Sequence, residues 1–293
     1  MVKKNKRVAK DIKGESKRIG LIQIDGKMPN LALMKLASWH KQKGDEVTVI
    51  DLSSHHFDVM YGSKIFMGGS GYDLKQELPK EIEAQVPDYE KFNLDHSIGF
   101  TSRGCIRDCD FCIVREKEGP IKEVDMSWIK HSKVLLIDNN FLASPKWKEK
   151  LQYFIDNKIK VCFNQGLDIR LINKEKAEML SKVKYSDLKF KVPRLYFAWD
   201  NINYEKEVSE GIELLLKAGI KLQHLMFYIL VGHNTTFEQD YYRFEKLSKI
   251  GAKPFIMLYN NCKDKKLRDF ARWVNKRYYM IFKFEDYKKE KLK

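Results

Sequence analysis

Three of the five cysteines of the chain lie within eight consecutive residues of the segment TSRGCIRDCDFC (101–112): Cys105, Cys109 and Cys112. Their C-x3-C-x2-C spacing offers three thiolates to a soft metal. Charged residues alternate with these cysteines, which argues against a purely apolar packing role. The sequence therefore predicts that this segment binds a metal or carries out catalysis rather than forming disulfides.

Two kinds of metal site are compatible with three cysteines. Tetrahedral zinc needs a fourth ligand, and the nearest downstream histidine, His131, is nineteen residues beyond Cys112. A [4Fe–4S] cluster held by three cysteines instead leaves one iron open for another ligand. An open coordination position implies chemistry, so the iron–sulfur interpretation is favoured. A zinc or iron–sulfur module that binds nucleic acid without catalysis is the non-enzymatic alternative.

The elements around this segment alternate between strand-like and helical patterns. Apolar runs typical of strands are 97–102, 133–138, 160–165, 194–200, 224–232 and 254–260. Helical patterns lie between several of them, at 144–157, 173–183 and 204–219. This alternation predicts a parallel α/β fold with six βα units in a partial, TIM-like (β/α)6 barrel. In such folds the active site lies at the carboxyl ends of the strands, and the cysteine segment follows the first of them.

A smaller lobe is predicted before the barrel. A strand at 18–25, a helix at 30–44 and a strand at 46–52 form a βαβ unit, which implies a parallel sheet. A third strand is expected at 64–74, where it ends in the glycine-rich turn MGGSGYD. We divide the chain into a basic leader, a Rossmann-like lobe, a barrel and a basic, aromatic C-terminal extension, at 1–17, 18–92, 93–260 and 261–293.

The cysteine spacing, with Phe111 just before the last cysteine and a strand in front, resembles the radical S-adenosylmethionine (SAM) superfamily. The resemblance covers roughly residues 93–260. It implies a [4Fe–4S] cluster whose open iron binds SAM, reductive cleavage of SAM to a 5′-deoxyadenosyl radical, and hydrogen abstraction from a substrate. It also implies an electron donor such as flavodoxin or ferredoxin.

Other positions match the superfamily less closely, and the resemblance implies contacts to SAM for them. Asp138, Asn139 and Asn140, in IDNNF after the second strand, are expected to bind the SAM ammonium, although the usual G-G-E is absent. Residues that follow the next strands are expected to complete the site: Gln165, Asp168, Arg170, Asp200 and Gly232. Arg170 is expected to pair with the SAM carboxylate.

The first lobe resembles the lobe that precedes the barrel in cobalamin-dependent members of the superfamily. The D-x-H-x-x-G motif that supplies the cobalt ligand is absent, and His55 and His56 are interpreted as loop histidines. We therefore expect a degenerate lobe without cobalamin. Cys262 and Tyr259, just beyond the sixth strand, are candidate catalytic residues as a hydrogen-atom donor or radical relay. Cys162 is expected in the core.

The 293-residue chain has a formal net charge of +15, which is concentrated at its ends. Residues 1–18 carry +6 and residues 263–293 carry +7, leaving about +2 for everything between them. Basic ends favour contact with phosphate backbones, so an RNA- or tRNA-modifying radical SAM enzyme is an alternative function. No run of eighteen apolar residues is present. We therefore expect a cytoplasmic enzyme with no membrane partner and leave its substrate open.

Overall fold

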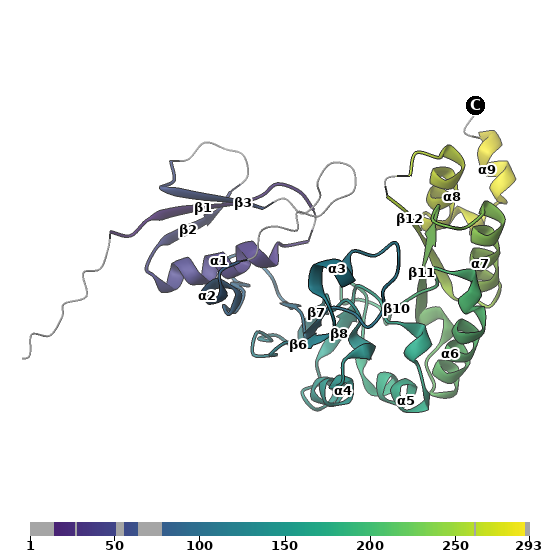
Figure 1. Ribbon diagram of the computed structural model, residues 1–293, viewed down its shortest axis with the longest axis horizontal. Helices are drawn as coiled ribbons and strands as arrows, with labels where there is room; N and C mark the ends of the chain where they lie inside the picture. The colour runs from purple at the N-terminus through teal and green to yellow at the C-terminus, as the bar shows by residue number, and fades with distance from the viewer. Residues whose placement is uncertain (1–14, 27, 51–55, 64–77, 261, 291–293) are drawn as a thin grey trace, which may run out of the picture. The chain divides into compact units, whose positions relative to one another are not determined.

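The computed structural model describes residues 15–26, 28–50, 56–63, 78–260 and 262–290. Its residues group into two compact units, each described here by itself. The described residues up to 92 form the N-terminal unit, and those from 93 onward form the C-terminal unit. Both are α/β structures built on parallel sheets, as the sequence predicts (Figure 1).

The N-terminal unit is a three-stranded parallel sheet in the order β2-β1-β3. It contains β1 (Arg18–Gln23), α1 (Leu31–Gln42), β2 (Glu46–Val49), β3 (Val59–Ser63) and the short α2 (Lys80–Glu83). Helix α1 begins where the Asn30 side chain accepts a hydrogen bond from the Leu33 N–H. Its apolar side packs on β1 around Ile19 and Leu21, which are fully buried.

The expected βαβ unit of this lobe is confirmed, and the sheet contains a further strand, β3, that was not expected from the sequence. Strand β3 pairs in parallel with β1, with Ile19 opposite Val59. Alternation of half-buried and exposed residues in VMYGS (59–63) marks this strand, but the run is short and contains a glycine. The strand expected at 64–74, His55 and the turn MGGSGYD lie outside the described residues. His56 is an exposed loop residue, as expected.

The C-terminal unit contains two parallel sheets and a small antiparallel pair. One sheet has the order β4-β7-β8-β9 and consists of β4 (Ser97–Gly99), β7 (Lys133–Leu136), β8 (Lys160–Phe163) and β9 (Lys184–Tyr185). The other has the order β10-β11-β12 and consists of β10 (Leu195–Ala198), β11 (Leu225–Val231) and β12 (Lys253–Leu258). A single parallel bridge, Leu167 to Phe197, joins the two sheets. Strand β9 is additional to the six that the sequence predicts.

Helices cover the outer faces of these strands in the C-terminal unit. Its longer helices are α4 (Trp147–Asp156), α5 (Lys174–Lys182), α6 (Glu205–Lys217), α7 (Phe237–Lys249) and α8 (Lys265–Asn275). In Figure 1, α6, α7 and α8 follow one another beside the second sheet. Every second residue of β11 is buried, from Leu225 to Val231, while the residues between them are half-buried. The odd-numbered face therefore forms the core, and the even-numbered face is more open.

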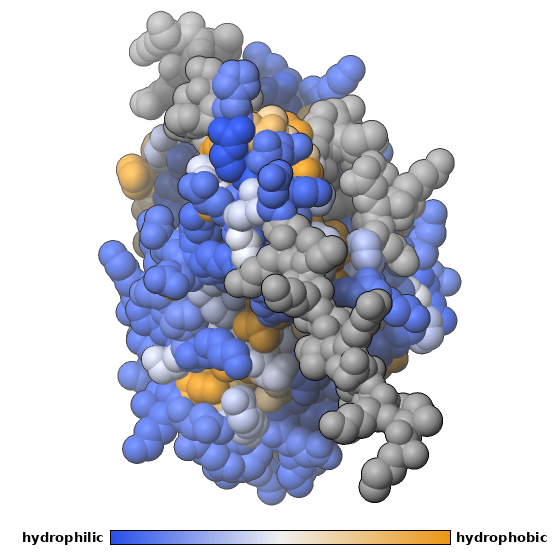
Figure 2. Space-filling model, turned by 90° about the vertical axis from the view of Figure 1, so that its left-hand side faces the viewer, coloured by the Kyte–Doolittle hydropathy of each residue, from blue (hydrophilic) through white to orange (hydrophobic). Residues whose placement is uncertain are grey.

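Shorter segments complete the C-terminal unit. Strands β5 (Ser102–Arg103) and β6 (Lys122–Glu123) form the antiparallel pair, and α3 (Val114–Glu118) lies between them in the sequence. Single 3-10 turns are η1 (Phe141–Ala143), η2 (Ile169–Leu171), η3 (Ile202–Tyr204), η4 (Leu222–His224) and η5 (Tyr278–Met280), and the chain continues to α9 (Phe284–Glu290). Figure 2 shows a mainly hydrophilic surface with small apolar patches. None of the described helices is long and apolar enough to cross a membrane.

Candidate functional site

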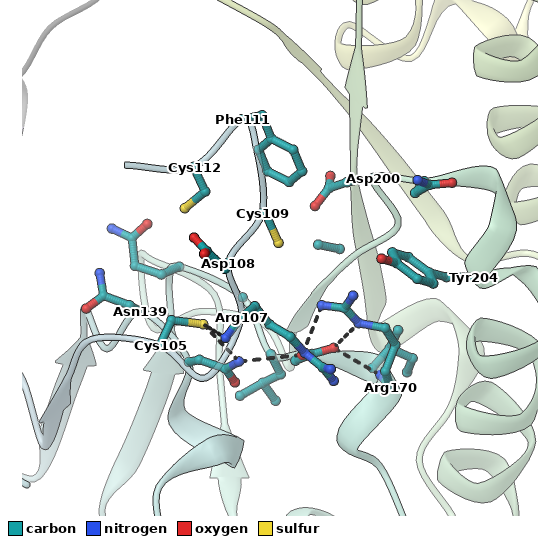
Figure 3. A pocket seen from close by; sticks show the side chains of 18 of the residues that line it. Cys105, Arg107, Asp108, Cys109, Phe111, Cys112, Asn139, Arg170, Asp200 and Tyr204 are labelled. Carbon is teal, nitrogen blue, oxygen red and sulfur yellow. Dashed lines mark hydrogen bonds and ion pairs between the residues drawn. The ribbon is translucent and has the colours of Figure 1, made fainter. Parts of the chain in front are cut away.

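A cavity of about 490 Å³ lies where the cysteine segment meets the carboxyl ends of β7, β8 and β10 (Figure 3). Ten of the residues predicted from the sequence line it: Cys105, Cys109, Phe111, Cys112, Asn139, Asn140, Gln165, Asp168, Arg170 and Asp200. They come from four separate stretches of the chain. The parallel strands bring these stretches together because their carboxyl ends lie at one edge.

The cysteine segment begins at a glycine that its neighbours require. Gly104 has a φ of +83°, and a Cβ there would lie 2.4 Å from the carbonyl oxygen of Pro120. Its N–H donates to the side-chain oxygen of Asn139, while the Cys105 N–H donates to the carbonyl of Gly119. The first turn of the segment is therefore held between two other loops, and only glycine fits there.

Two donors point at the sulfur of the first cysteine. The Arg107 N–H lies 3.3 Å from Cys105 Sγ, and the Asn140 side-chain amide lies 3.4 Å from it. Donors directed at sulfur stabilise a thiolate and tune a bound metal centre. The side-chain oxygen of Asn140 is buried and has no hydrogen-bond partner. This oxygen is therefore a free hydrogen-bond acceptor in the wall of the cavity.

All three cysteines are free thiols. Burial raises the pKa of Cys109 and of Cys112, so both are protonated at neutral pH in the metal-free protein. Among the described residues, no three His, Cys, Asp or Glu side chains converge tightly enough to hold a single metal ion. In a [4Fe–4S] cluster each cysteine binds a different iron, which requires wider separation of the sulfurs than a mononuclear site does. Three thiols that line one cavity are the donor type that iron–sulfur clusters use.

An ion-paired cluster beside Cys105 and Asn140 forms another part of the cavity wall. Asp168 accepts hydrogen bonds from Arg170 at 2.7 Å and 3.1 Å, and from Arg107 Nε at 3.0 Å. The two guanidinium groups hold the pKa of the Asp168 carboxyl below its usual value, although burial opposes them. The Arg170 guanidinium also lies over the ring of Tyr204, 4.5 Å from its centre. Because two guanidinium groups pair with one carboxylate, this cluster carries a net positive charge.

Asp200 supplies a second carboxyl group, in a different environment. Burial raises its pKa to about 6, and the neighbouring Arg243 and Arg170 oppose that rise. One oxygen accepts a hydrogen bond from the Leu230 N–H. The carbonyl of the same Leu230 accepts a hydrogen bond from Arg243. Arg243 is fully buried, pairs with Asp240 and also donates to the carbonyl of Trp199. Arg243 therefore links the segment after β10, which carries Asp200, to the end of β11, which donates to Asp200.

Asp138 does not line the cavity, in contrast to the contact expected for it. Its buried carboxylate accepts hydrogen bonds from the backbone N–H and hydroxyl groups of both Thr101 and Ser102, at 2.6 to 2.8 Å. Burial raises the pKa of Asp138, and these four donors oppose the rise. Asp138 thus joins the end of β7 to the start of the cysteine segment and acts on the site by positioning it.

The remaining predicted residues lie at the ends of β11 and β12. Gly232, with a φ of +81°, faces Leu267 and Cys262, and the Tyr259 ring packs 4.4 Å from the ring of His233. Phe111 packs against the other side of this cluster, 5.6 Å from His233. Gly232, Tyr259 and Cys262 are absent from the cavity lining. These residues are linked to the cavity by Phe111, which lines the cavity and whose ring contacts His233.

Several residues of the site were not predicted from the sequence. Arg107 and Tyr204 line the cavity, His233 contacts the cysteine segment, and Arg243 holds the neighbouring strand ends. Arg107 lies between the first two cysteines, and this position could have indicated that it belongs to the site. Arg243 lies in mid-helix and no local pattern marks it. Cys162 is fully buried, as expected, and burial raises its pKa to about 12.

Comparison with known proteins gives no assignment. No protein-family model and no curated protein sequence matches this chain.

Proposed function

We propose that this protein is a radical SAM enzyme in which Cys105, Cys109 and Cys112 hold one [4Fe–4S] cluster. The observation that carries the proposal is the set of three free thiols on one loop, lining one cavity with Arg170 and Asp200. When bound, the cluster supplies one electron to SAM, which is cleaved to methionine and a 5′-deoxyadenosyl radical that abstracts hydrogen from a substrate. Flavodoxin or ferredoxin is the class of electron donor that this reaction needs.

The residues around the thiols have separate tasks in this proposal. The positive wall of Arg107 and Arg170 attracts the SAM carboxylate, and Arg170 offers it a charge-assisted hydrogen bond. Asn140 and Asp200 offer oxygen acceptors to the SAM ammonium; the Asn140 oxygen is buried without a partner. Phe111 provides an apolar surface at the cavity edge. Carboxylate and ammonium thus meet complementary charge, which orients SAM in one direction.

We further propose that the parallel strands of the C-terminal unit form one partial barrel in the order β4-β7-β8-β10-β11-β12. The bridge between Leu167 and Phe197 supports this order because it joins the loop after β8 to β10. A partial barrel would surround the cavity with strand ends and limit the access of water to it. An enclosed site protects a radical from solvent.

Anaerobic reconstitution with iron and sulfide tests the assignment. We expect about four irons and four sulfides per chain, and 5′-deoxyadenosine on reduction with SAM. The triple variant C105A/C109A/C112A should lose all of these signals. The matched control, Cys262→Ala, removes a thiol outside the cavity lining and should retain the iron. Stoichiometric zinc without SAM binding, or iron and SAM cleavage in the triple variant, would contradict the proposal.

A further inference from the structure

Basic residues mark the starts of the parallel strands in the C-terminal unit. Lys133, Lys160, Lys184 and Lys253 are the first residues of β7, β8, β9 and β12, and Arg194 directly precedes β10. Strand β11 begins just after η4, which follows Lys221 and ends at His224. Strands that run in parallel start at the same edge of their sheet. The cations are therefore gathered at the edge opposite the cysteine cavity.

The sheet register places three of these lysines side by side. Lys133 is the register partner of Lys160, and Lys160 is the partner of Lys184. Neighbouring strands are about 4.8 Å apart, and like charges directly opposite one another destabilise a sheet. Only Lys133 of the three pairs with a carboxylate among the described residues, that of Asp95 at 2.6 Å. This row therefore carries uncompensated positive charge.

A second group of cations surrounds the start of β11. Burial lowers the pKa of His224, and Lys221, Arg194 and Lys253 lower it further. Arg194 and Arg277 likewise lower the pKa of Lys253, in addition to burial. The sheet register agrees with this proximity. Leu195 lies opposite Leu225, Met226 lies opposite Lys253, and Arg194 donates to the carbonyl of Gln223 at 2.8 Å. One carboxylate, Asp187, acts on Arg194 in the opposite direction.

The number of cations at these strand starts is large compared with the net charge of residues 19–262, which contain all of them except Arg277. Residues between the two basic ends carry only about +2 in total. The cations are therefore clustered at this edge rather than spread over the surface. In the described part of the chain, Lys184, Lys221 and Lys253 form no ion pair. Rigid strand starts fix their positions. The repulsion between them would be relieved by a ligand with regularly spaced negative charges.

We propose that this edge, here called the strand-start face, binds the phosphate backbone of a single-stranded nucleic acid. The face is defined by Lys133, Lys160, Lys184, Lys221, Lys253 and Arg277. Arg194 is buried and donates to the carbonyl of Gln223, so it adds positive charge near the face without being exposed on it. A line of cations across several strands suits a linear polyanion, and each phosphate contact releases a condensed counterion. The face lies at the other ends of the strands from the cavity, so a bound strand leaves the cavity accessible.

The test measures binding of a fluorescent, mixed-sequence single-stranded RNA by the full-length protein over a range of salt concentrations. The test variant is K184Q/K221Q, because both lysines are exposed and lie outside the cavity. We expect affinity to fall about tenfold at 0.1 M salt, and the slope of log K against log salt to fall by about 1.4. Both basic ends remain in this variant, so their contribution is unchanged.

The matched control is K206Q/K217Q, which removes the same charge from exposed lysines on α6. Each of these lysines has a glutamate partner on its own helix. The control should bind RNA as the wild type does. Equal weakening in both double variants, or no weakening in K184Q/K221Q, would overturn the proposal, as would binding only to phosphatidylserine vesicles. Single-stranded DNA as a second probe identifies which sugar is preferred. Metal-free protein suffices, so this result is independent of the radical SAM proposal.

Discussion

The Nε2 atom of His233 lies 3.1 Å from Oδ1 of Asp110, which joins the end of β11 to the middle of the cysteine segment. Asn234, the next residue, donates to the other oxygen of Asp110 at 3.0 Å. Asp110 stands between Cys109 and Cys112, and the His233 ring also packs against Phe111. These contacts restrain the part of the segment that carries two of the three thiols.

Replacing His233 by Ala should loosen the cysteine segment without unfolding the protein. Loss of the Asp110 contact and of the packing against Phe111 removes restraints on residues 105–112. We expect amide hydrogen exchange in this segment to accelerate about tenfold, with little change elsewhere. Hydrogen exchange measured by mass spectrometry on metal-free protein provides the readout, and slower recovery of iron on reconstitution should accompany it.

A closely matched histidine serves as the control for this variant. His96 also lies 3.1 Å from an aspartate, Asp95, and its side chain has the same 16% exposure as that of His233. His96 precedes β4 and has no contact with the cysteine segment among the described interactions. His96→Ala should leave exchange in residues 105–112 unchanged. Equal acceleration in both variants would show that the restraint we assign to His233 does not exist.

Gly104→Ala should disrupt the turn that introduces the cysteines. An added Cβ would lie 2.4 Å from the Pro120 carbonyl oxygen and 2.7 Å from that of Gly119, and both are backbone atoms that cannot move alone. We expect a loss of stability of about 3 kcal/mol and poor iron incorporation. Urea unfolding of the metal-free protein and iron analysis after reconstitution measure the two effects.

Gly219→Ala is the control that distinguishes the steric clash at Gly104 from the backbone strain of a positive φ alone. Gly219 has a φ of +88°, close to that of Gly104, but a Cβ there would meet nothing within 4 Å. Its substitution should cost about 1 kcal/mol and leave iron incorporation intact. If Gly104→Ala is no more destabilising than Gly219→Ala, the packing around the turn is looser than the geometry implies.

The elements and the main site residues were predictable because their signals are local. Apolar runs with polar ends identified β7, β8, β10, β11 and β12, and parallel pairing then required their carboxyl ends to meet. Ten predicted residues consequently line one cavity. Strand β9 was missed because it has only two residues, which pair with the first two residues of β8.

The contacts that position the site were not predictable, because they join residues far apart in sequence. Asp138 follows a strand as a ligand would, yet its four hydrogen-bond donors come from Thr101 and Ser102. Arg243 is an ordinary helical arginine until the fold brings it to the carbonyls of Trp199 and Leu230. A sequence indicates which groups reach a strand end, whereas tertiary packing decides which of them face the cavity.

Asp168→Asn should destabilise the protein at neutral pH. The wild-type carboxylate is ionised and paired with Arg170 and Arg107, and its pKa lies below the unfolded value of 3.8. Its contribution is therefore present above pH 4 and is lost as the pH falls toward the folded pKa. We expect a deficit of about 3 kcal/mol at pH 7 that shrinks below pH 4, measured by urea unfolding. A deficit that is independent of pH would exclude ionisation of Asp168 as its source.

Asp200→Asn should have the opposite effect on stability. Burial raises the folded pKa of Asp200 to about 6 from an unfolded value of 3.8, so the folded state retains a proton that the unfolded state loses between these values. Wild-type stability therefore falls as pH rises from about 4 to 6, and ionisation costs about 3 kcal/mol above that range. Asparagine avoids this cost and retains an oxygen to accept the Leu230 N–H.

The expected result is that Asp200→Asn equals the wild type near pH 4 and is more stable by about 2 to 3 kcal/mol at pH 7.5, in urea unfolding of metal-free protein. Under the proposed function, binding of SAM to the reconstituted variant should weaken, because Asp200 is the carboxylate that we propose for the SAM ammonium. A stabilised variant that binds SAM less tightly is typical of a group kept for function at a cost to stability. Lower stability than the wild type at pH 7.5 would show that Asp200 serves the fold instead.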